Sequence, residues 1–136
     1  MPHLIVEYSG NLEDRVDPRA LVQVVHEAGL ATGEFELKAI RTRAEKRDVY
    51  AVANGHPDNA FVTVTLRILR GRDEATRRRI GEGIFNAVCG YLERACGTAP
   101  LAISLEVQEI EPISFARNNL PDRRLLHDDP SAVNER

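Results

Sequence analysis

The chain has little of what marks several classes of protein. Its 136 residues include no tryptophan and only two cysteines, and the formal net charge is −3. A transmembrane helix needs about 18 consecutive apolar residues, and no such run occurs, so we expect no contact with a membrane. Proteins that bind nucleic acid usually carry a basic face. The slight acidic excess argues against that class, and we expect no nucleic-acid partner.

The two cysteines are placed where they can neither pair nor hold a metal together. Cys89 and Cys96 lie seven residues apart in one predicted helix, which separates them by about 10 Å along its axis. A disulfide needs a closer approach, and CxxC spacing and nearby histidines are missing. We therefore expect reduced thiols without a metal role. No secretory leader is recognisable near Met1, so we expect a cytoplasmic protein.

Lysine is almost missing from the basic residues. Of 18 basic side chains only Lys38 and Lys46 are lysine, and the other 16 are arginine. Arginine carries a planar fork that binds a carboxylate through two hydrogen bonds. A few of the arginines are therefore candidates for binding an acidic substrate, although codon bias in a GC-rich genome explains most of them.

The size of the chain fits one globular domain. With 43% hydrophobic residues, it can bury a modest core by itself or complete its core in an oligomer. We predict a single domain over residues 1–121. Residues 122–136 are predicted to form a polar C-terminal tail, because they contain few apolar side chains.

The first half of the predicted domain has the order strand, helix, strand. A strand over residues 2–8 is followed by a helix that starts at Pro18 with Asp17 as its N-cap. A second strand is expected from about Leu37, and alternation places Arg41 and Arg43 on one of its faces. Dense turn signals then fill residues 48–59.

The second half repeats this order. Phe61–Leu69 is a β-branched strand, and Asp73 caps a long helix that ends near Gly97. The last strand covers Leu101–Gln108. Three glycines inside the long helix indicate close packing against a sheet, because each is costly in a helix; they are Gly81, Gly83 and Gly90.

The two β-α-β units are expected to merge into an α+β fold. Right-handed crossovers leave few topologies, and we predict a four-stranded mixed sheet with both helices on one face. The other face is then uncovered. Because large exposed apolar patches are rare in monomers, we expect neighbouring subunits to bury it, with a trimer as the preferred assembly.

Pro2 is the strongest candidate for a catalytic residue in the sequence. If Met1 is removed, Pro2 carries a secondary amine at the end of a strand. A free α-amino group has a pKa near 8, and partial burial lowers it further, which suits a general base at neutral pH. The alternative is that proline is tolerated there as the first residue of a strand. Position alone favours this alternative.

Four segments together carry a family resemblance. They are PHLIVEYSGN at the start, Ala39–Arg43, DNAFVTVTLRILRGR ending at Arg72, and SLEVQEIEPISFARNN near the end of the predicted domain. In this order they resemble the 5-carboxymethyl-2-hydroxymuconate Δ-isomerases of the tautomerase superfamily, over roughly residues 2–120. The resemblance reverses the preference on Pro2. It implies a homotrimer of β-α-β-β-α-β subunits that needs no metal, nucleotide or other cofactor.

The resemblance also implies a reaction and its residues. Pro2 would move a proton from the 2-hydroxyl to C5 of a dienol di- or triacid from homoprotocatechuate degradation. Arg72 and Arg41 match family arginines that act with the proline on the substrate carboxylates. Arg43 is a secondary candidate for substrate binding, and Phe61 is a candidate for an apolar wall beside the amine. Core packing explains Phe61 equally well.

Other readings stay open at this point. Fold does not settle function, so the chain could be a trimeric binding protein without catalysis, or a related tautomerase or hydratase that acts on another unsaturated acid. The chain also departs from the family in having no tryptophan and in carrying Tyr50 where a larger aromatic is expected. His3 is expected to face away from the pocket of Pro2, because neighbouring residues of a strand point to opposite faces.

Overall fold

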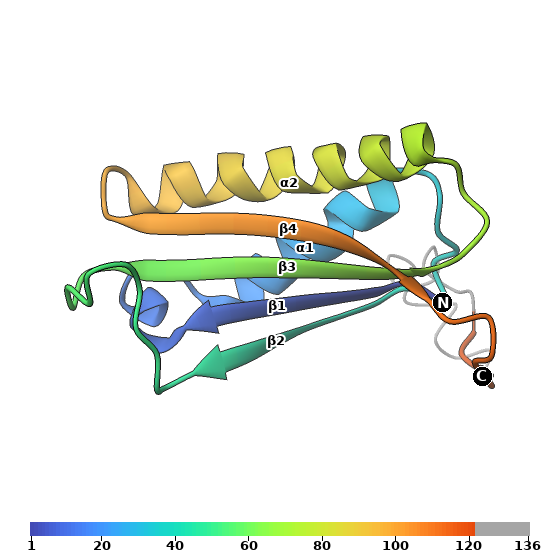
Figure 1. Ribbon diagram of the computed structural model, residues 1–136, viewed down its shortest axis with the longest axis horizontal. Helices are drawn as coiled ribbons and strands as arrows, with labels where there is room; N and C mark the ends of the chain where they lie inside the picture. Colours follow the sequence, from blue (N-terminus) through green and yellow to red (C-terminus); the bar gives the residue numbers. More distant parts are fainter. Residues whose placement is uncertain (122–136) are drawn as a thin grey trace, which may run out of the picture.

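Two helices lie on one side of a four-stranded sheet in the computed structural model, which describes residues 1–121 (Figure 1). This is the α+β arrangement of two β-α-β units that the sequence predicts. In chain order the elements are β1 (His3–Ser9), the 3-10 turn η1 (Gly10–Asp14), α1 (Pro18–Ala31), β2 (Arg41–Arg47), β3 (Ala60–Leu69), α2 (Glu74–Cys96) and β4 (Leu101–Ile110).

The strands pair in the order β2-β1-β3-β4. β1 is parallel to β2, β3 is parallel to β4, and the two pairs meet antiparallel between β1 and β3. The sheet is therefore mixed, as predicted. Each parallel pair is joined through a helix, because parallel neighbours need a crossover connection. The antiparallel junction brings the start of β1 beside the end of β3, where His3 is opposite Arg67.

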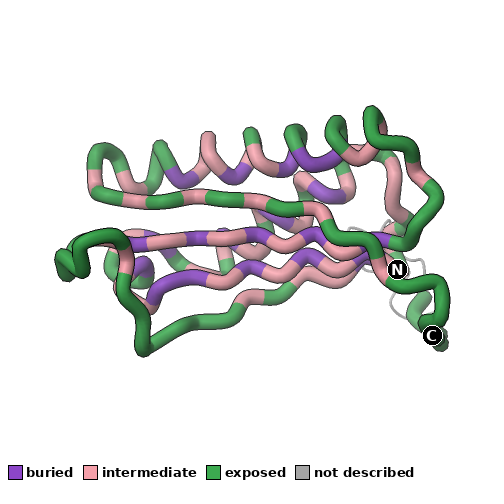
Figure 2. The backbone as a smooth tube through the Cα atoms, viewed as in Figure 1, coloured by how far each residue is buried: buried purple, intermediate pink, exposed green. Residues whose placement is uncertain are grey.

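The core lies between the sheet and the helices. Alternate residues of β1 and β3 are buried along both strands, and so are residues on one side of each helix (Figure 2). Their side chains form one hydrophobic cluster between the sheet and the helices. The edge strands β2 and β4 contribute half-buried side chains instead. The most deeply buried side chains of the core are Leu4, Val6, Leu12, Leu21, Val25, Val62, Val64, Leu66, Ile68, Ile80, Ile84 and Leu92.

Both helices begin at the residues that the sequence predicts. Asp17 accepts a hydrogen bond from the backbone N–H of Arg19 at 2.9 Å, and Pro18 occupies the first helical position. Asp73 accepts one from the backbone N–H of Thr76 at 2.8 Å. These caps fix where each helix starts, and the second one also fixes the loop that precedes α2.

Only one of the three glycines of α2 packs closely against the sheet. A Cβ at Gly81 would lie 3.2 Å from a methyl carbon of Val107 in β4, so a larger residue there would push helix and strand apart. A Cβ at Gly83 would meet open space, and one at Gly90 would meet only Arg94 of the same helix. The prediction is therefore wrong for Gly83 and Gly90, because neither faces β4.

The second strand begins later than predicted. Leu37 lies in a turn, in which the N–H of Ile40 donates to the carbonyl oxygen of Glu36 at 3.3 Å. β2 starts only at Arg41, which is opposite His3 of its parallel neighbour β1. The prediction that this strand begins at Leu37 is wrong. Side-chain alternation alone does not show where the neighbouring strand β1 begins to pair with it.

The face of the sheet away from the helices is largely polar. Glu7 of β1 accepts a hydrogen bond from Arg47 of β2 at 2.5 Å, and Ser104 of β4 donates one to Thr63 of β3 at 2.8 Å. The reason given above for an assembly, an apolar free face, is therefore wrong: polar side chains alternate across this face, and its strongest apolar members are few. They are Ile5, Phe61, Leu69 and Ile110.

Three further predictions concern membrane, thiols and tail. In residues 1–121, α1 and α2 both fall short of the length and apolar character that crossing a membrane requires. Cys89 and Cys96 are free, and burial raises the pKa of both thiols. The predicted tail, residues 122–136, lies outside the described residues.

Candidate active site

The start of the chain lies in the sheet, next to the start of β2. Pro2 is buried, and its carbonyl oxygen accepts a hydrogen bond from the N–H of Arg41 at 3.1 Å. While Met1 is attached, the nitrogen of Pro2 is an amide and the free amine belongs to Met1. Removal of Met1 would place the amine about 3.8 Å further along the chain, on a residue that is already fixed by its hydrogen bond to β2.

The surroundings of this amine favour its neutral form. Burial lowers the pKa of the Met1 amine, the positive charges of Arg72 and Arg41 lower it further, and Glu36 opposes them. An amine with a lowered pKa loses its proton at a lower pH than an ordinary N-terminus and can act as a base nearer to neutrality. The structure thus brings together the chain start and the two arginines that the sequence singled out.

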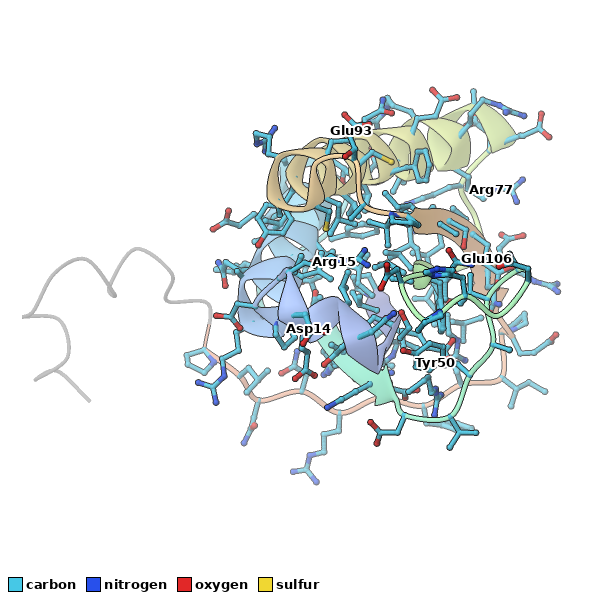
Figure 3. The ribbon with its side chains drawn as sticks, turned by 90° about the vertical axis from the view of Figure 1, so that its left-hand side faces the viewer. Asp14, Arg15, Tyr50, Arg77, Glu93 and Glu106 are labelled. Atoms are coloured by element: carbon cyan, nitrogen blue, oxygen red, sulfur yellow. The ribbon has the colours of Figure 1, made fainter. Side chains whose placement is uncertain are left out.

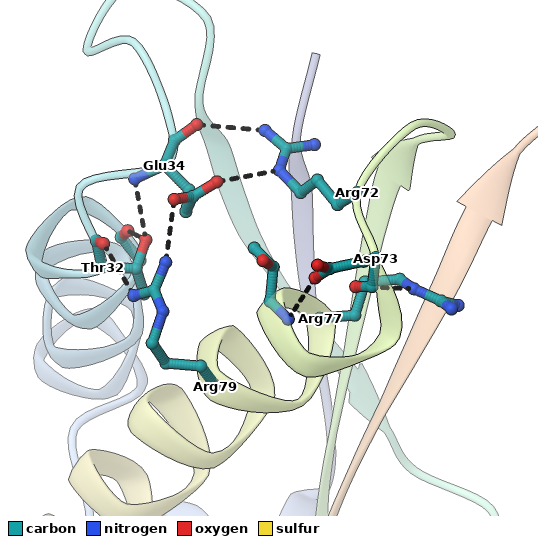
Figure 4. A network of polar contacts seen from close by, with 8 residues as sticks. Thr32, Glu34, Arg72, Asp73, Arg77 and Arg79 are labelled. Atoms are coloured by element: carbon teal, nitrogen blue, oxygen red, sulfur yellow. Dashed lines mark hydrogen bonds and ion pairs between the residues drawn. The ribbon is translucent and has the colours of Figure 1, made fainter.

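Arg72 is held from two sides just before α2. Its Nε donates to the carboxylate of Glu34 at 3.2 Å, and its Nη2 donates to the backbone carbonyl of Glu34 at 3.0 Å (Figure 4). Its guanidinium carbon lies 5.2 Å from the centre of the Phe35 ring, a cation–π contact. The side chain keeps 26% of its surface exposed. Arg72 is therefore fixed in place and still accessible to a solute.

Arg41 and Arg43 share the free face of the sheet, as predicted, because they align with His3 and Ile5 of β1. The ring Nδ1 of His3 lies 3.2 Å from Nη1 of Arg43. Burial and then the charges of Arg43, Arg67 and Arg41 lower the pKa of His3, which favours the neutral form of the ring. His3 lies on the same face as Arg41 and Arg43, opposite to Leu4. That it faces away from the pocket of Pro2 stays a prediction.

Phe61 lies at the other end of the sheet. Its N–H donates to Oγ of Ser9 at 2.9 Å, and Ser9 is separated from the start of β1 by about 20 Å at the usual rise per residue. Its ring meets Tyr50 edge-on, with ring centres 6.2 Å apart, at the end of the molecule that faces the viewer in Figure 3. Within one subunit the structure does not bring Phe61 to Pro2.

Sequence reasoning missed the segment between α1 and β2 that surrounds the amine and Arg72. It contains Glu34 and Phe35, which contact Arg72, and Glu36, whose charge acts on the amine. The only signal in the sequence is a run of two acidic residues around an aromatic one in a loop. No local pattern in the sequence indicates that this loop packs beside Arg72, almost forty positions later.

The candidate site residues do not line the hollow that is found in one subunit. A hollow of about 430 Å³ lies between α2 and β4, lined by residues such as Gly81, Phe85 and Leu105, but Pro2, Arg41 and Arg72 are not among them. Within residues 1–121, no group of three or more His, Cys, Asp or Glu side chains gathers in a way that could hold a metal ion. The chemistry available at the chain start is thus an amine flanked by guanidinium groups.

Comparison with known sequences matches the chain to one family. The model of the 5-carboxymethyl-2-hydroxymuconate isomerase family matches residues 2–124. A 5-carboxymethyl-2-hydroxymuconate Delta-isomerase of Escherichia coli is 36% identical over 121 residues, which are 88% of this chain and 96% of the relative.

Solved structures extend the comparison to the fold. The crystal structure of a 5-carboxymethyl-2-hydroxymuconate isomerase from Deinococcus radiodurans R1 superposes with a TM-score of 0.78 at 30% identity, covering 87% of this chain and 90% of that one. The symmetric trimer of a wild-type fused 4-OT superposes with a TM-score of 0.57 at 18% identity over 81% of this chain and 88% of its own, which shows the fold alone. The chain belongs to the 5-carboxymethyl-2-hydroxymuconate isomerase family and has the tautomerase fold.

Proposed function

We propose that this chain isomerises 5-carboxymethyl-2-hydroxymuconate, with the amine of Pro2 as general base after removal of Met1. The observation that carries the proposal is the group of charges at the chain start, where Arg72 and Arg41 both lower the pKa of the terminal amine that Met1 carries in the structure. The substrate is proposed from the family and from the E. coli and D. radiodurans relatives, which act on this compound by name.

The reaction needs one base and fixed positive charge. Neutral Pro2 takes the proton of the 2-hydroxyl, the C2–O bond becomes a carbonyl, and the double bonds move one position along the chain. The proton then returns to C5, so that the amine is neutral again at the end. Negative charge spreads over the oxygen at C2 and the carboxylates during the shift, and fixed cations aimed there lower the barrier. Arg72 and Arg41 serve this role, and Arg43 is a further substrate-binding candidate.

The active unit of the proposal is a homotrimer. It is supported by the position of Phe61 about 20 Å from Pro2 in one subunit and by a structural relative described as a symmetric trimer. In a ring of subunits, Phe61 of one copy would be able to wall the amine of another. The two free thiols suit the reducing cytoplasm, where the enzyme would serve the degradation of homoprotocatechuate.

The test compares a free with a blocked N-terminus. Intact-mass measurement first establishes whether Met1 is removed from the untagged protein. Conversion of 5-carboxymethyl-2-hydroxymuconate is then followed by its ultraviolet absorbance for the untagged chain, for a chain with an N-terminal extension, and for a chain with the same extension at its C-terminus.

The N-terminal extension acylates the proline nitrogen and should lower kcat/KM by about a hundredfold or more, the usual worth of a general base. The C-terminal extension should leave it unchanged. Pro2→Ala, which keeps an amine but loses the ring, should fall between the two. Equal rates for the untagged and the N-terminally extended protein would reject Pro2 as the base. Binding without turnover in all forms would identify a binding protein instead of a catalyst.

A further inference from the structure

Arg72 has a limited number of hydrogen-bond donors, and the structure shows which are in use. A guanidinium group has five N–H donors in a planar fork. Nε gives its single N–H to a carboxylate oxygen of Glu34, and Nη2 gives one of its two to the carbonyl oxygen of the same residue. In the part of the chain that the structure describes, Nη1 makes no hydrogen bond. The side edge of the fork is thus occupied and its end is open.

Glu34 is itself fixed by a second arginine. Its other carboxylate oxygen accepts a hydrogen bond from Nη2 of Arg79 at 2.8 Å, and Nη1 of Arg79 donates to the carbonyl oxygen of Thr32 at 3.2 Å. Figure 4 shows the carboxylate of Glu34 between the two guanidinium groups. Because Arg79 projects from α2 and Thr32 ends α1, both helices hold the carboxylate in place.

The face of the guanidinium is also covered. The ring of Phe35 lies 5.2 Å from its central carbon, and such a contact resists rotation of the plane. Glu34 and Phe35 therefore define both the edge and the tilt of one cation. Two donors of Nη1 and one of Nη2 remain, and this is the geometry that receives a carboxylate through two parallel hydrogen bonds.

We propose that Glu34 is a positioning residue, which holds the side edge of Arg72 so that the open end of its guanidinium group receives a substrate carboxylate. This inference deepens the proposed function and rests on it, because it assigns the carboxylate contact of that reaction to one edge of one arginine. Arg79 acts one step further away by fixing Glu34.

The first experiment measures kcat and KM for Glu34→Ala and Glu34→Gln. Loss of the edge contact should raise KM about tenfold in the alanine variant, the usual worth of one charge-assisted hydrogen bond, with a smaller change in kcat. The glutamine variant keeps an acceptor for Nε and should recover part of the loss. Glu109→Ala is the matched control, since Glu109 also pairs with an arginine, Arg77 at 3.4 Å, and is exposed to a similar extent. It should keep the KM of the wild type.

A double-mutant comparison separates positioning from a general loss of structure. In an Arg72→Ala background, Glu34→Ala should change KM less than twofold, because the residue that it positions is gone. An equal loss in both backgrounds, or an unchanged KM in Glu34→Ala, would overturn the inference.

Binding of cis,cis-muconate, measured by calorimetry, keeps this test apart from that of the proposed function. If the chain fails to isomerise 5-carboxymethyl-2-hydroxymuconate but binds muconate, with affinity reduced about tenfold by both Arg72→Ala and Glu34→Ala, the proposed function fails and the positioning role stands. If muconate does not bind, or binds equally to wild type and both variants, the open edge is not a carboxylate site and the inference fails.

Discussion

The surroundings at the two ends of β1 shift the pKa of a nearby group in opposite directions. At its start, burial and two arginines lower the pKa of the chain's amine and so favour loss of its proton. At its end, the hydroxyl of Tyr8 donates to the carboxylate of Glu13 at 2.7 Å, and burial together with this contact raises the pKa of Tyr8 to about 12. The amine at the start of β1 therefore loses its proton more readily than usual, whereas the hydroxyl of Tyr8 at the end of β1 keeps its proton to higher pH.

The difference comes from which charges each end collects. At the far end most polar groups are satisfied within the chain: Ser9 is fully buried and bonded to Phe61, and Arg15 donates to the carbonyl oxygens of Asp58 and Pro100 at 2.6 and 3.0 Å. The exception among the described residues is Oδ1 of Asn11, which is buried without a hydrogen-bond partner. Figure 3 views this end, with Arg15 in the middle of the molecule. At the start of β1, cations outnumber the acids that face them. That imbalance suits an anionic ligand, whereas the balance at the far end suits stability.

The largest expected effect is that of removing a cation from the reactive end. Arg72→Ala should lower kcat/KM about a hundredfold, because a fixed donor for developing charge is lost. It should also raise the pKa of the amine, since the Arg72 charge lowers it, and so move the acid limb of the pH profile to higher pH. The profile of kcat/KM against pH measures both. An unchanged acid limb would mean that Arg72 does not act on the base.

The next effect concerns the far end of β1, around Ser9. Ser9→Ala removes the buried hydroxyl that accepts the hydrogen bond of the half-buried Phe61 N–H, and should lower the free energy of unfolding by about 2 kcal/mol, the cost of a donor left unsatisfied. Ser104→Ala, which loses an exposed hydroxyl contact to Thr63, is the control and should cost less. Urea denaturation measures both, and the acid limb of the activity profile should stay in place. Equal stability of the two variants would show that this end is not held by its buried hydrogen bonds.

A smaller effect is expected from Tyr8→Phe. It should lower the free energy of unfolding by about 1 kcal/mol at neutral pH, because the hydrogen bond to Glu13 is lost. The folded pKa of Tyr8 is raised from 10 to about 12. The stabilisation is therefore complete below the unfolded pKa and disappears as the pH rises through the folded one. The stability gap between wild type and variant should narrow between pH 10 and about 12. A gap that widens there would contradict the assignment.

The smallest effect sharpens the comparison at the reactive end. Glu36 raises the pKa of the amine against the two arginines, so Glu36→Gln should lower that pKa and move the acid limb of the kcat/KM profile to lower pH. Glu27→Gln, on the exposed side of α1, is the control and should leave the limb where it is. A shift to higher pH in Glu36→Gln would show that this carboxylate does not act on the base through its charge.

Much of the fold could be predicted because it depends on local patterns. Alternation in Phe61–Leu69 and the capping residues Asp17 and Asp73 located β3 and both helices. The start of β2 could not be predicted, since it depends on where β1 offers a partner to Arg41. Helical glycines are equally ambiguous, because the sequence does not tell that Gly81 faces β4 and Gly83 does not.

Of the candidate site, the sequence by itself determined the chemical groups, namely a proline behind the first methionine and arginines in motifs of the family. Only the tertiary structure decided which of them meet. It placed Arg72 beside the chain start and put Phe61 at the far end of the sheet. It also brought Glu34 to the side edge of Arg72. The physical reason is that charge and hydrogen bonding act over a few ångströms in space, and the spacing of residues along the chain does not set that distance.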